Sequence, residues 1–143
     1  MINITIINGP NLNLLGKREP GVYGTASFDD CLADLIQKYP SVHFTYFQSN
    51  IEGEIVDAIQ KAGFEQDGII INPAAYTHTS VAIGDAIAAI QTKVIEVHIS
   101  NVHAREDFRK ISHVSSKVVG SIVGLGLQGY ALATEWFVSN ANK

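Results

Sequence analysis

Side chains that can bind a small polar molecule or move protons gather in three stretches of the sequence. Asparagine offers both a hydrogen-bond donor and an acceptor, which suits hydroxyl groups, and arginine offers a planar pair of donors for a carboxylate. Histidine and tyrosine can transfer protons. The stretches contain Asn8, Asn11, Asn13, Arg18 and Tyr23, then Asn72, Tyr76, Thr77 and His78, and then Glu96, His98, Ser100, Asn101, His103, Arg105 and Arg109. This inventory predicts a site for a polyhydroxylated or carboxylated small molecule.

Glu96 and His98 are separated by one residue in an apolar stretch that is typical of a β-strand. Because successive side chains of a strand point to opposite faces, this spacing puts Glu96 and His98 on the same face. A carboxylate in that position could fix the tautomer of the imidazole and prepare His98 for proton transfer. A hydrogen-bonded histidine of the core is the alternative that remains open.

Tyr23 and Arg18 share the long segment Gly9–Gly24, and segments of that length without regular structure are typically functional. A tyrosine acts as a base only as tyrosinate, and with a reference pKa of about 10 roughly 0.1% is ionised at neutral pH. A nearby guanidinium favours the anion. Lowering the pKa to about 7 takes about 4 kcal/mol, which requires a closed, dry site with further donors. A tyrosine packed over apolar surface is the open alternative.

Several of the other polar residues have simpler interpretations. Asn8 and Asn13 can form Asx turns, and Arg109 can form an ion pair on a helix surface. His103 and His113 are expected to be solvated.

Gly124, Gly126 and Gly129 match the pattern G-x-G-x-x-G between a predicted strand and a predicted helix. The pattern is a weak nucleotide signal here, because it follows the last strand rather than the first. We interpret these glycines as allowing a tight turn and close packing of a helix on the sheet.

Two kinds of segment alternate along the chain and would position these side chains. Apolar, β-branched stretches predict strands at Ile2–Ile7, Val42–Phe47, Gly68–Ile71, Lys93–Ile99 and Lys117–Val123. Apolar residues at helical spacing predict helices at Ser27–Lys38, Glu52–Ala62, Thr79–Ile90 and Gln128–Asn140. The alternation predicts an α/β fold: a flavodoxin-like doubly wound five-stranded parallel sheet with helices on both faces, in a single domain over residues 1–143. Ligands of such sheets bind outside the carboxyl ends of the strands, where the polar stretches fall.

The composition of the 143-residue chain narrows the class of protein. Hydrophobic residues make up 46% and charged residues 17%, which excludes a disordered chain and suggests a surface partly covered by copies of itself. The net charge of −4 argues against nucleic acid or an anionic membrane as partner. We expect no membrane span, which needs about 20 continuous apolar residues, and no signal peptide. The single Cys31 cannot form an internal disulfide, which favours a cytoplasmic location.

The motifs resemble one family, the type II 3-dehydroquinate dehydratases (type II dehydroquinases). The matching segments span nearly the whole chain in the family's order: residues 8–16 (NGPNLNLLG), 18–24 (REPGVYG), 48–50 with 52–54 (QSN, EGE), 72–80 (NPAAYTHTS), 96–101 with 105–109 (EVHISN, REDFR), and 124–126 with 129–130 (GLG, GY). The resemblance implies conversion of 3-dehydroquinate to 3-dehydroshikimate in the shikimate pathway. It implies an anti elimination through an enolate, with no metal, no organic cofactor and no Schiff-base lysine.

The resemblance also implies catalytic roles. Tyr23 matches the base that removes the proton next to the ketone, and Arg18 matches the lid arginine that favours tyrosinate. His98 matches the acid that protonates the departing hydroxyl. Glu96 matches the partner that orients this histidine, and Asn11 matches the residue that holds the water stabilising the enolate oxygen.

Substrate-binding positions of the family are matched by Asn72, His78, Ile99, Ser100 and Arg109. Of these, Ile99 and Ser100 look like the backbone amides that grip the carboxylate, and Arg109 looks like the contact to a ring hydroxyl. Asp85 matches a residue that reaches the site from a neighbouring subunit. It follows His78 by two helical turns, so we expect both residues on one face of one helix.

The resemblance further implies a homo-oligomer, a dodecamer built as a tetramer of trimers. Two positions depart from the family pattern. Gly84 stands where members often carry a larger, frequently basic residue, and Ile51 stands where many carry histidine. Neither is a catalytic position, so the departures bear on the subunit interface and the rim of the site.

Three other functions are compatible with the expected fold but agree less well with the residues at the strand ends. A phospho-signalling receiver domain needs acidic residues after the first and third strands and a lysine after the fifth, where this chain has Asn8, Asn72 and Leu125. A flavin-binding electron carrier needs a hydroxyl-rich phosphate loop after the first strand, and Gly9–Leu12 lacks it. A non-catalytic flavodoxin-like binding module for a hydroxylated ring acid is the main alternative; it predicts loss of Tyr23, Arg18 or His98, all of which are present.

Overall fold

The computed structural model describes residues 1–17, 21 and 26–142. Two residues of the predicted site, Arg18 and Tyr23, therefore lie outside the described residues.

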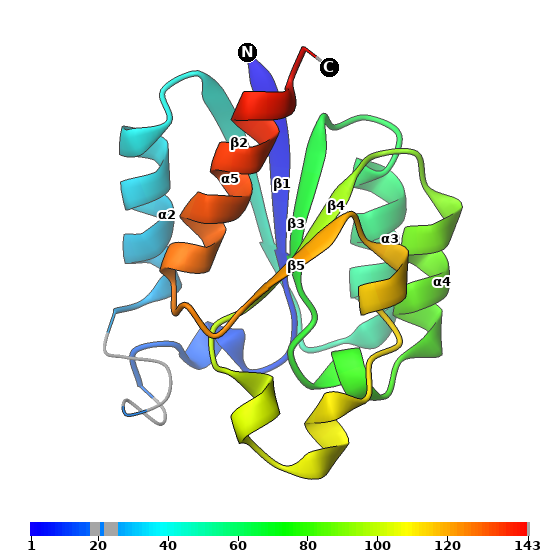
Figure 1. Cartoon of the computed structure of the whole chain (residues 1–143). Coiled ribbons are helices and arrows are strands. Elements are labelled where there is room, and N and C mark those ends of the chain that lie inside the picture. Colours follow the sequence, from blue (N-terminus) through cyan, green and yellow to red (C-terminus); the bar gives the residue numbers. More distant parts are fainter. Residues whose placement is uncertain (18–20, 22–25, 143) are drawn as a thin grey trace.

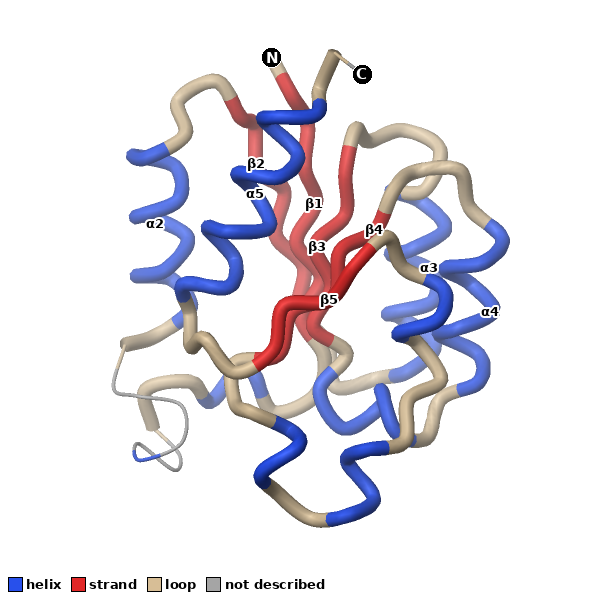
Figure 2. The backbone as a smooth tube through the Cα atoms, in the orientation of Figure 1, coloured by secondary structure: helices blue, strands red, loops and turns tan. Residues whose placement is uncertain are grey.

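Five parallel strands form one twisted sheet in the order β2-β1-β3-β4-β5 (Figures 1 and 2). Their bounds are β1 Ile2–Asn8, β2 Val42–Gln48, β3 Gly68–Asn72, β4 Val94–His98 and β5 Gly120–Val123. Asn8 at the end of β1 is level with Gln48 of β2 and Asn72 of β3. The strand ends therefore meet at one edge, and the prediction of a doubly wound α/β fold is confirmed.

Among the described residues, four α-helices cover the sheet, with α2 (Phe28–Lys38) and α5 (Gln128–Asn140) on one face and α3 (Glu52–Ala62) and α4 (Val81–Ala89) on the other (Figure 1). The start of α2 is fixed by a capping box, in which Ser27 and Asp30 satisfy each other's backbone N–H groups. The bounds of α3 and α5 agree with the sequence prediction.

Each face of the sheet has its own apolar core. Ile4, Ile6 and Ile70 pack under α2 and α5, whereas Ile7 and Ile71 pack under α3 and α4. The central strands are apolar at nearly every position because both of their faces are covered. On β4, Val97 belongs to the α5 side, so Glu96 and His98 face the side of α3 and α4.

Two sequence predictions about the placement of elements are wrong, whereas the bounds of the other predicted strands and helices differ from the structure by two residues at most. The fifth strand begins at Gly120, and Lys117 lies instead in a 3₁₀ helix, η5 (Ser115–Lys117). His78 and Asp85 do not share a helix, because His78 ends a separate 3₁₀ helix, η2 (Ala74–His78). The Ser80 side chain accepts from the Ile83 N–H at 3.0 Å and caps the start of α4 at Val81. The helical spacing between His78 and Asp85 is therefore interrupted at Ser80.

The interpretation of residues 1–143 as one domain stays a prediction. No helix in the described part of the chain is long and apolar enough to cross a membrane.

Candidate active site

A cavity of about 100 Å³ lies at the carboxyl ends of β1, β3 and β4. Most of the predicted site residues meet there: Asn11, Asn72, His78, His98, Ile99, Ser100 and Arg109 all line it. Glu96 lies behind His98, whereas Asp85 is exposed on α4 and does not line this cavity. Residues that follow different strands therefore do lie together at the strand ends, although they are up to 98 positions apart in the sequence, from Asn11 to Arg109.

His98 is held by Glu96 through a short contact of 2.6 Å between His98 Nε2 and Glu96 Oε2. An ionised carboxylate only accepts hydrogen bonds, so His98 carries a proton on Nε2. The other ring nitrogen, Nδ1, is then the atom that a ligand in the cavity can use. The geometry confirms the prediction that the two side chains share one face of the strand.

Glu96 is completely buried, and both of its oxygens accept hydrogen bonds. The hydroxyls of Ser115 and Ser121 each donate to Oε1 at 2.7 Å. Burial raises the pKa of the carboxyl, but the hydrogen bonds and charge of His98 and the two serine hydroxyls outweigh it, so the pKa lies below its ordinary value. Glu96 is therefore ionised at neutral pH.

Sequence reasoning missed both serines. Ser121 stands level with Glu96 in the pairing of β4 with β5, and only that register, which a single sequence does not reveal, points to it.

Replacing Glu96 with glutamine should destabilise the fold by about 1–3 kcal/mol at pH 7 and make stability less dependent on acid pH. Because the folded-state pKa lies below the ordinary value of 4.5, the ionised carboxylate stabilises the fold fully above pH 4.5. That contribution is lost as the pH falls through the folded-state pKa. Urea unfolding of both proteins between pH 3 and 7 measures the difference, with Glu52→Gln on the exposed surface as the control. Parallel pH curves for wild type and Glu96→Gln would contradict the assignment.

His78 is oriented by the backbone of a distant segment. Its Nδ1 lies 2.7 Å from the carbonyl oxygen of Ile111, and because a carbonyl only accepts, Nδ1 carries the proton. Burial lowers the pKa of His78, and the bond to Ile111 opposes that shift only in part. His78 is therefore neutral at neutral pH and can accept a hydrogen bond at Nε2.

A buried network fixes Asn72 at the floor of the cavity. Asn72 donates to the Tyr130 hydroxyl at 3.1 Å, and Tyr130 donates to Asn8 Oδ1 at 2.7 Å. Asn8 in turn donates to the Tyr46 hydroxyl at 3.3 Å. Burial raises the pKa of Tyr130 far above its ordinary value, which keeps it a neutral donor. The interpretation of Asn8 as an Asx turn is wrong, because its fully buried side chain joins this network.

Asn11 is presented by a tight turn at the end of β1. It has a φ of 70°, in the left-handed region that asparagine tolerates better than most residues. Its N–H donates to Asn50 Oδ1 at 3.0 Å, and Gln48 donates to the same oxygen at 3.2 Å. Gly9, two residues before Asn11, is required in this turn, because a Cβ there would lie 2.5 Å from the carbonyl oxygen of Pro73.

Two arginines form the rim. Arg109 Nε donates to Glu106 Oε2 at 2.8 Å, and Arg109 also lines the cavity. Both sequence interpretations of Arg109, a surface ion pair and a site residue, therefore agree with the structure. The hydrogen bond from Arg109, helped by its charge, lowers the pKa of the exposed Glu106 carboxyl. Arg105, which the sequence inventory includes but to which no role was assigned, also lines the cavity, and it donates to the Ser100 hydroxyl at 3.4 Å. Two guanidinium groups and neutral His78 favour a ligand with a carboxylate and hydroxyls.

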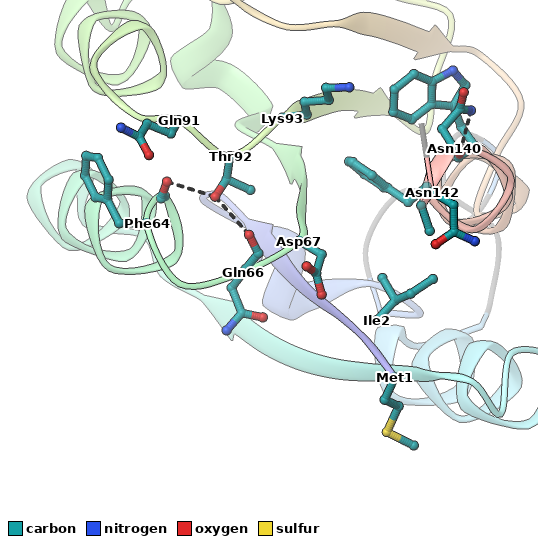
Figure 3. Close-up of a pocket in the computed structure, with 14 residues that line it drawn as sticks. Met1, Ile2, Phe64, Gln66, Asp67, Gln91, Thr92, Lys93, Asn140 and Asn142 are labelled. Atoms are coloured by element: carbon teal, nitrogen blue, oxygen red, sulfur yellow. Dashed lines mark hydrogen bonds between the residues drawn. The ribbon is translucent and has the colours of Figure 1, made fainter.

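A larger hollow of about 630 Å³ lies at the opposite end of the sheet, around Phe64, Lys93 and the C-terminal part of α5 (Figure 3). Its polar groups largely bind one another. Thr92 donates to the carbonyl oxygens of Gly63 and Gln66 at 2.8 and 3.0 Å (Figure 3), and Asp67 accepts from the Asn3 N–H at 2.7 Å. We therefore place the candidate site in the smaller cavity, because of the two described linings only this one includes a histidine that is held by a carboxylate.

Within the described residues, no group of three or more His, Cys, Asp or Glu side chains could hold a metal ion. The described lining of the smaller cavity also contains no lysine.

The sheet and this cavity define a doubly wound α/β protein in which a histidine oriented by a buried carboxylate lies beside two arginines. The sequence model described as "Dehydroquinase class II" matches residues 2–138. This chain belongs to that family.

Individual relatives cover nearly the whole chain. A 3-dehydroquinate dehydratase of Fusobacterium nucleatum is 52% identical over 148 residues, covering 99% of this chain and 100% of that protein. A catabolic 3-dehydroquinase of Aspergillus clavatus is 53% identical over 140 residues, covering 96% of this chain and 93% of that protein. The crystal structure of a type II dehydroquinase from Butyrivibrio crossotus matches with a TM-score of 0.92 at 47% identity, covering 96% of this chain and 97% of that one.

Proposed function

We propose that this chain is a 3-dehydroquinate dehydratase, a hydro-lyase of the shikimate pathway that converts 3-dehydroquinate to 3-dehydroshikimate. The observation that carries this function is its 52% identity to the dehydratase of Fusobacterium nucleatum over the whole of both chains. The oriented His98–Glu96 pair at the strand ends supports it, because a dehydratase needs a group that protonates the departing hydroxyl. A non-catalytic binding module has no comparable support.

We propose that His98 is the general acid. Glu96 fixes its tautomer from behind and complements the positive charge that the ring carries when protonated. In the form that acts as the acid, the ring is an imidazolium with protons on both nitrogens. The Nδ1 proton passes to the departing hydroxyl, which leaves as water while the C–O bond breaks and the enolate electrons form the new C=C bond, and the Nε2 proton stays hydrogen-bonded to Glu96. Because Glu96 is ionised and buried, it acts as a positioning residue and does not itself meet the substrate.

We propose that the proton next to the ketone is removed by Tyr23, with Arg18 favouring the tyrosinate. These two roles rest on the matching motif at residues 18–24 alone. Asn11, which lines the cavity, would hold the water that stabilises the enolate oxygen. The reaction is then an anti elimination in two steps, with the enolate between proton removal and loss of water.

The rest of the cavity is proposed to bind the substrate. The backbone N–H groups of Ile99 and Ser100 suit its carboxylate, and Arg109 suits a ring hydroxyl. Neutral His78 accepts from a hydroxyl at Nε2, and Asn72 is held in place by Tyr130. The cavity of about 100 Å³ is small for a ligand site, so the arginine side chains on its rim would shift when the ring enters.

We also propose a cytoplasmic homo-oligomer, a dodecamer built as a tetramer of trimers, in which Asp85 reaches the site of a neighbouring copy. The exposure of Asp85 on α4 is compatible with that role. Three large apolar side chains near the cavity, Val81, Phe108 and Ile111, are 58%, 52% and 57% exposed in one chain, which supports their burial between copies.

The test of the function is an absorbance assay for the conjugated enone product. The purified protein is expected to turn over 3-dehydroquinate at a rate that survives both a chelator and pre-treatment with borohydride and substrate. Survival would agree with proton transfer by side chains without a required metal or imine. Absence of product from the folded protein would contradict the proposed function, and loss of activity after borohydride would contradict the proposed mechanism.

A further inference from the structure

A short segment, Ile111–Ser115, contacts both histidine systems of the site. At one end the carbonyl oxygen of Ile111 accepts from His78 Nδ1 at 2.7 Å. At the other end the Ser115 hydroxyl donates to Glu96 Oε1 at 2.7 Å, and Glu96 holds His98. The segment follows the 3₁₀ helix η4 (Asp107–Lys110) and ends on the first residue of η5, in the connection from β4 to β5.

The segment is pinned internally by Ser112. The Ser112 oxygen accepts from the N–H groups of Val114 and Ser115 at 3.1 and 2.9 Å, and it lies 2.9 Å from the Ser115 hydroxyl. Because Ser115 gives its proton to Glu96, Ser112 must be the donor in that last contact. A directed chain of hydroxyls therefore runs from Ser112 through Ser115 to Glu96.

The segment is also pinned to the fold beneath it. Val114 is completely buried in the core under α3 and α4, and the His113 N–H donates to the Thr77 carbonyl at 2.9 Å. His113 is half-buried as a result, so the expectation that it is solvated is wrong.

Gly84 on α4 permits this arrangement. A Cβ at Gly84 would lie 2.1 Å from the His113 carbonyl oxygen, closer than any side chain allows. The segment and α4 therefore touch backbone to backbone, next to the point where the segment reaches the two histidine systems.

We propose that Ile111–Ser115 is a positioning segment that sets the ring orientations of His78 and His98 together, so that one loop couples substrate binding to proton delivery. It acts through a backbone carbonyl on His78 and through Ser115 and Glu96 on His98. Its kinetic consequences rest on the proposed dehydratase function, whereas its effect on the two imidazole rings does not.

Ser112→Ala tests the coupling, because it loosens the segment without removing a direct partner of either histidine. Loss of a hydrogen bond of this kind should raise KM and lower kcat, each by about two- to tenfold. Ser121→Ala is the matched comparison: Ser121 donates to the same Glu96 oxygen but from β5, so it should lower kcat and leave KM unchanged. Ser112→Thr keeps the hydroxyl and should restore both constants, and the exposed Ser116→Ala should change neither.

Nitrogen-15 NMR of the histidine rings at pH 8 gives a readout that needs no turnover. The wild-type chain should show protonated Nδ1 in His78 and protonated Nε2 in His98. Ser112→Ala should shift both ring signals toward mixed tautomers, and Ser121→Ala should shift only that of His98. Gly84→Ala, which displaces the segment from the opposite side, should reproduce the double effect in whatever fraction of the protein folds.

The outcomes distinguish the proposed dehydratase function from the proposed role of the segment. A wild-type chain without dehydratase activity would contradict the proposed function, and the NMR comparison would still decide on the segment. An active wild type in which Ser112→Ala changes kcat alone, or changes neither constant and neither ring, would overturn the coupling. Equal patterns for Ser112→Ala and Ser121→Ala would do the same.

Discussion

Replacing His98 with alanine is expected to lower kcat for loss of water by about 10²–10⁴-fold while exchange of the substrate's α proton with solvent persists. The removed imidazole is the only titratable side chain that the structure shows bound to the buried Glu96 carboxylate, within the described residues. Without it the departing hydroxyl leaves unprotonated, whereas proton removal on the other side of the ring needs no acid from His98. The enolate should therefore form and revert.

Two measurements in deuterated water check this result. Absorbance reports the product, and NMR reports deuterium entering the unreacted substrate. His103→Ala, at an exposed position of the 3₁₀ helix Val102–Ala104, should match the wild type in both. The unfolding free energy of His98→Ala should fall by about 1–3 kcal/mol, because Glu96 loses one buried donor. If exchange and elimination were slowed equally, the acid would have to be another residue.

Replacing Tyr23 with phenylalanine should abolish exchange and elimination alike, with at least about a 10²–10⁴-fold loss of turnover, while substrate still binds. Phenylalanine keeps the ring and removes only the ionisable oxygen. In the proposed mechanism the site stabilises the Tyr23 tyrosinate by about 4 kcal/mol at neutral pH, and phenylalanine has no ionisable group that could replace it. Binding should persist because the carboxylate and hydroxyl contacts come from other residues.

The control for this variant is Tyr39→Phe. The Tyr39 hydroxyl donates to the Ala131 carbonyl at 3.1 Å between α2 and α5, outside the cavity, so its loss should leave turnover near the wild-type value. Calorimetry with the substrate measures binding to the inactive Tyr23→Phe protein. Retention of the wild-type rate in that protein would remove Tyr23 from the role of base.

The sequence predicts features that depend on local residue spacing, and it misses features that depend on contacts between distant segments. The Ile-rich strands and the capped helices are set by local spacing, and the strand-end rule then gathers residues as distant as Asn11 and Arg109 in one cavity. The expected common face of His78 and Asp85 failed for a local reason as well: Ser80 caps a new helix between them.

Other parts of the site depend on register between segments that no local pattern links. Ser121 meets Glu96 only because β5 pairs with β4 in one particular register. Ser115 arrives there through the turn around Ser112, and Tyr130 reaches Asn8 across 122 residues of sequence. Such contacts are determined by tertiary packing, and residue spacing in the sequence does not predict them.

The Tyr130 contact has a consequence for the order in which the site is completed during synthesis. The ribosome makes Asn8 and Asn72 long before α5, and until that helix docks their buried amides lack the phenol that binds both of them. Each unsatisfied amide costs about 1–3 kcal/mol once it is buried. We therefore expect the floor of the pocket to form only after α5 has docked, so that the chain becomes able to bind its ligand late in synthesis.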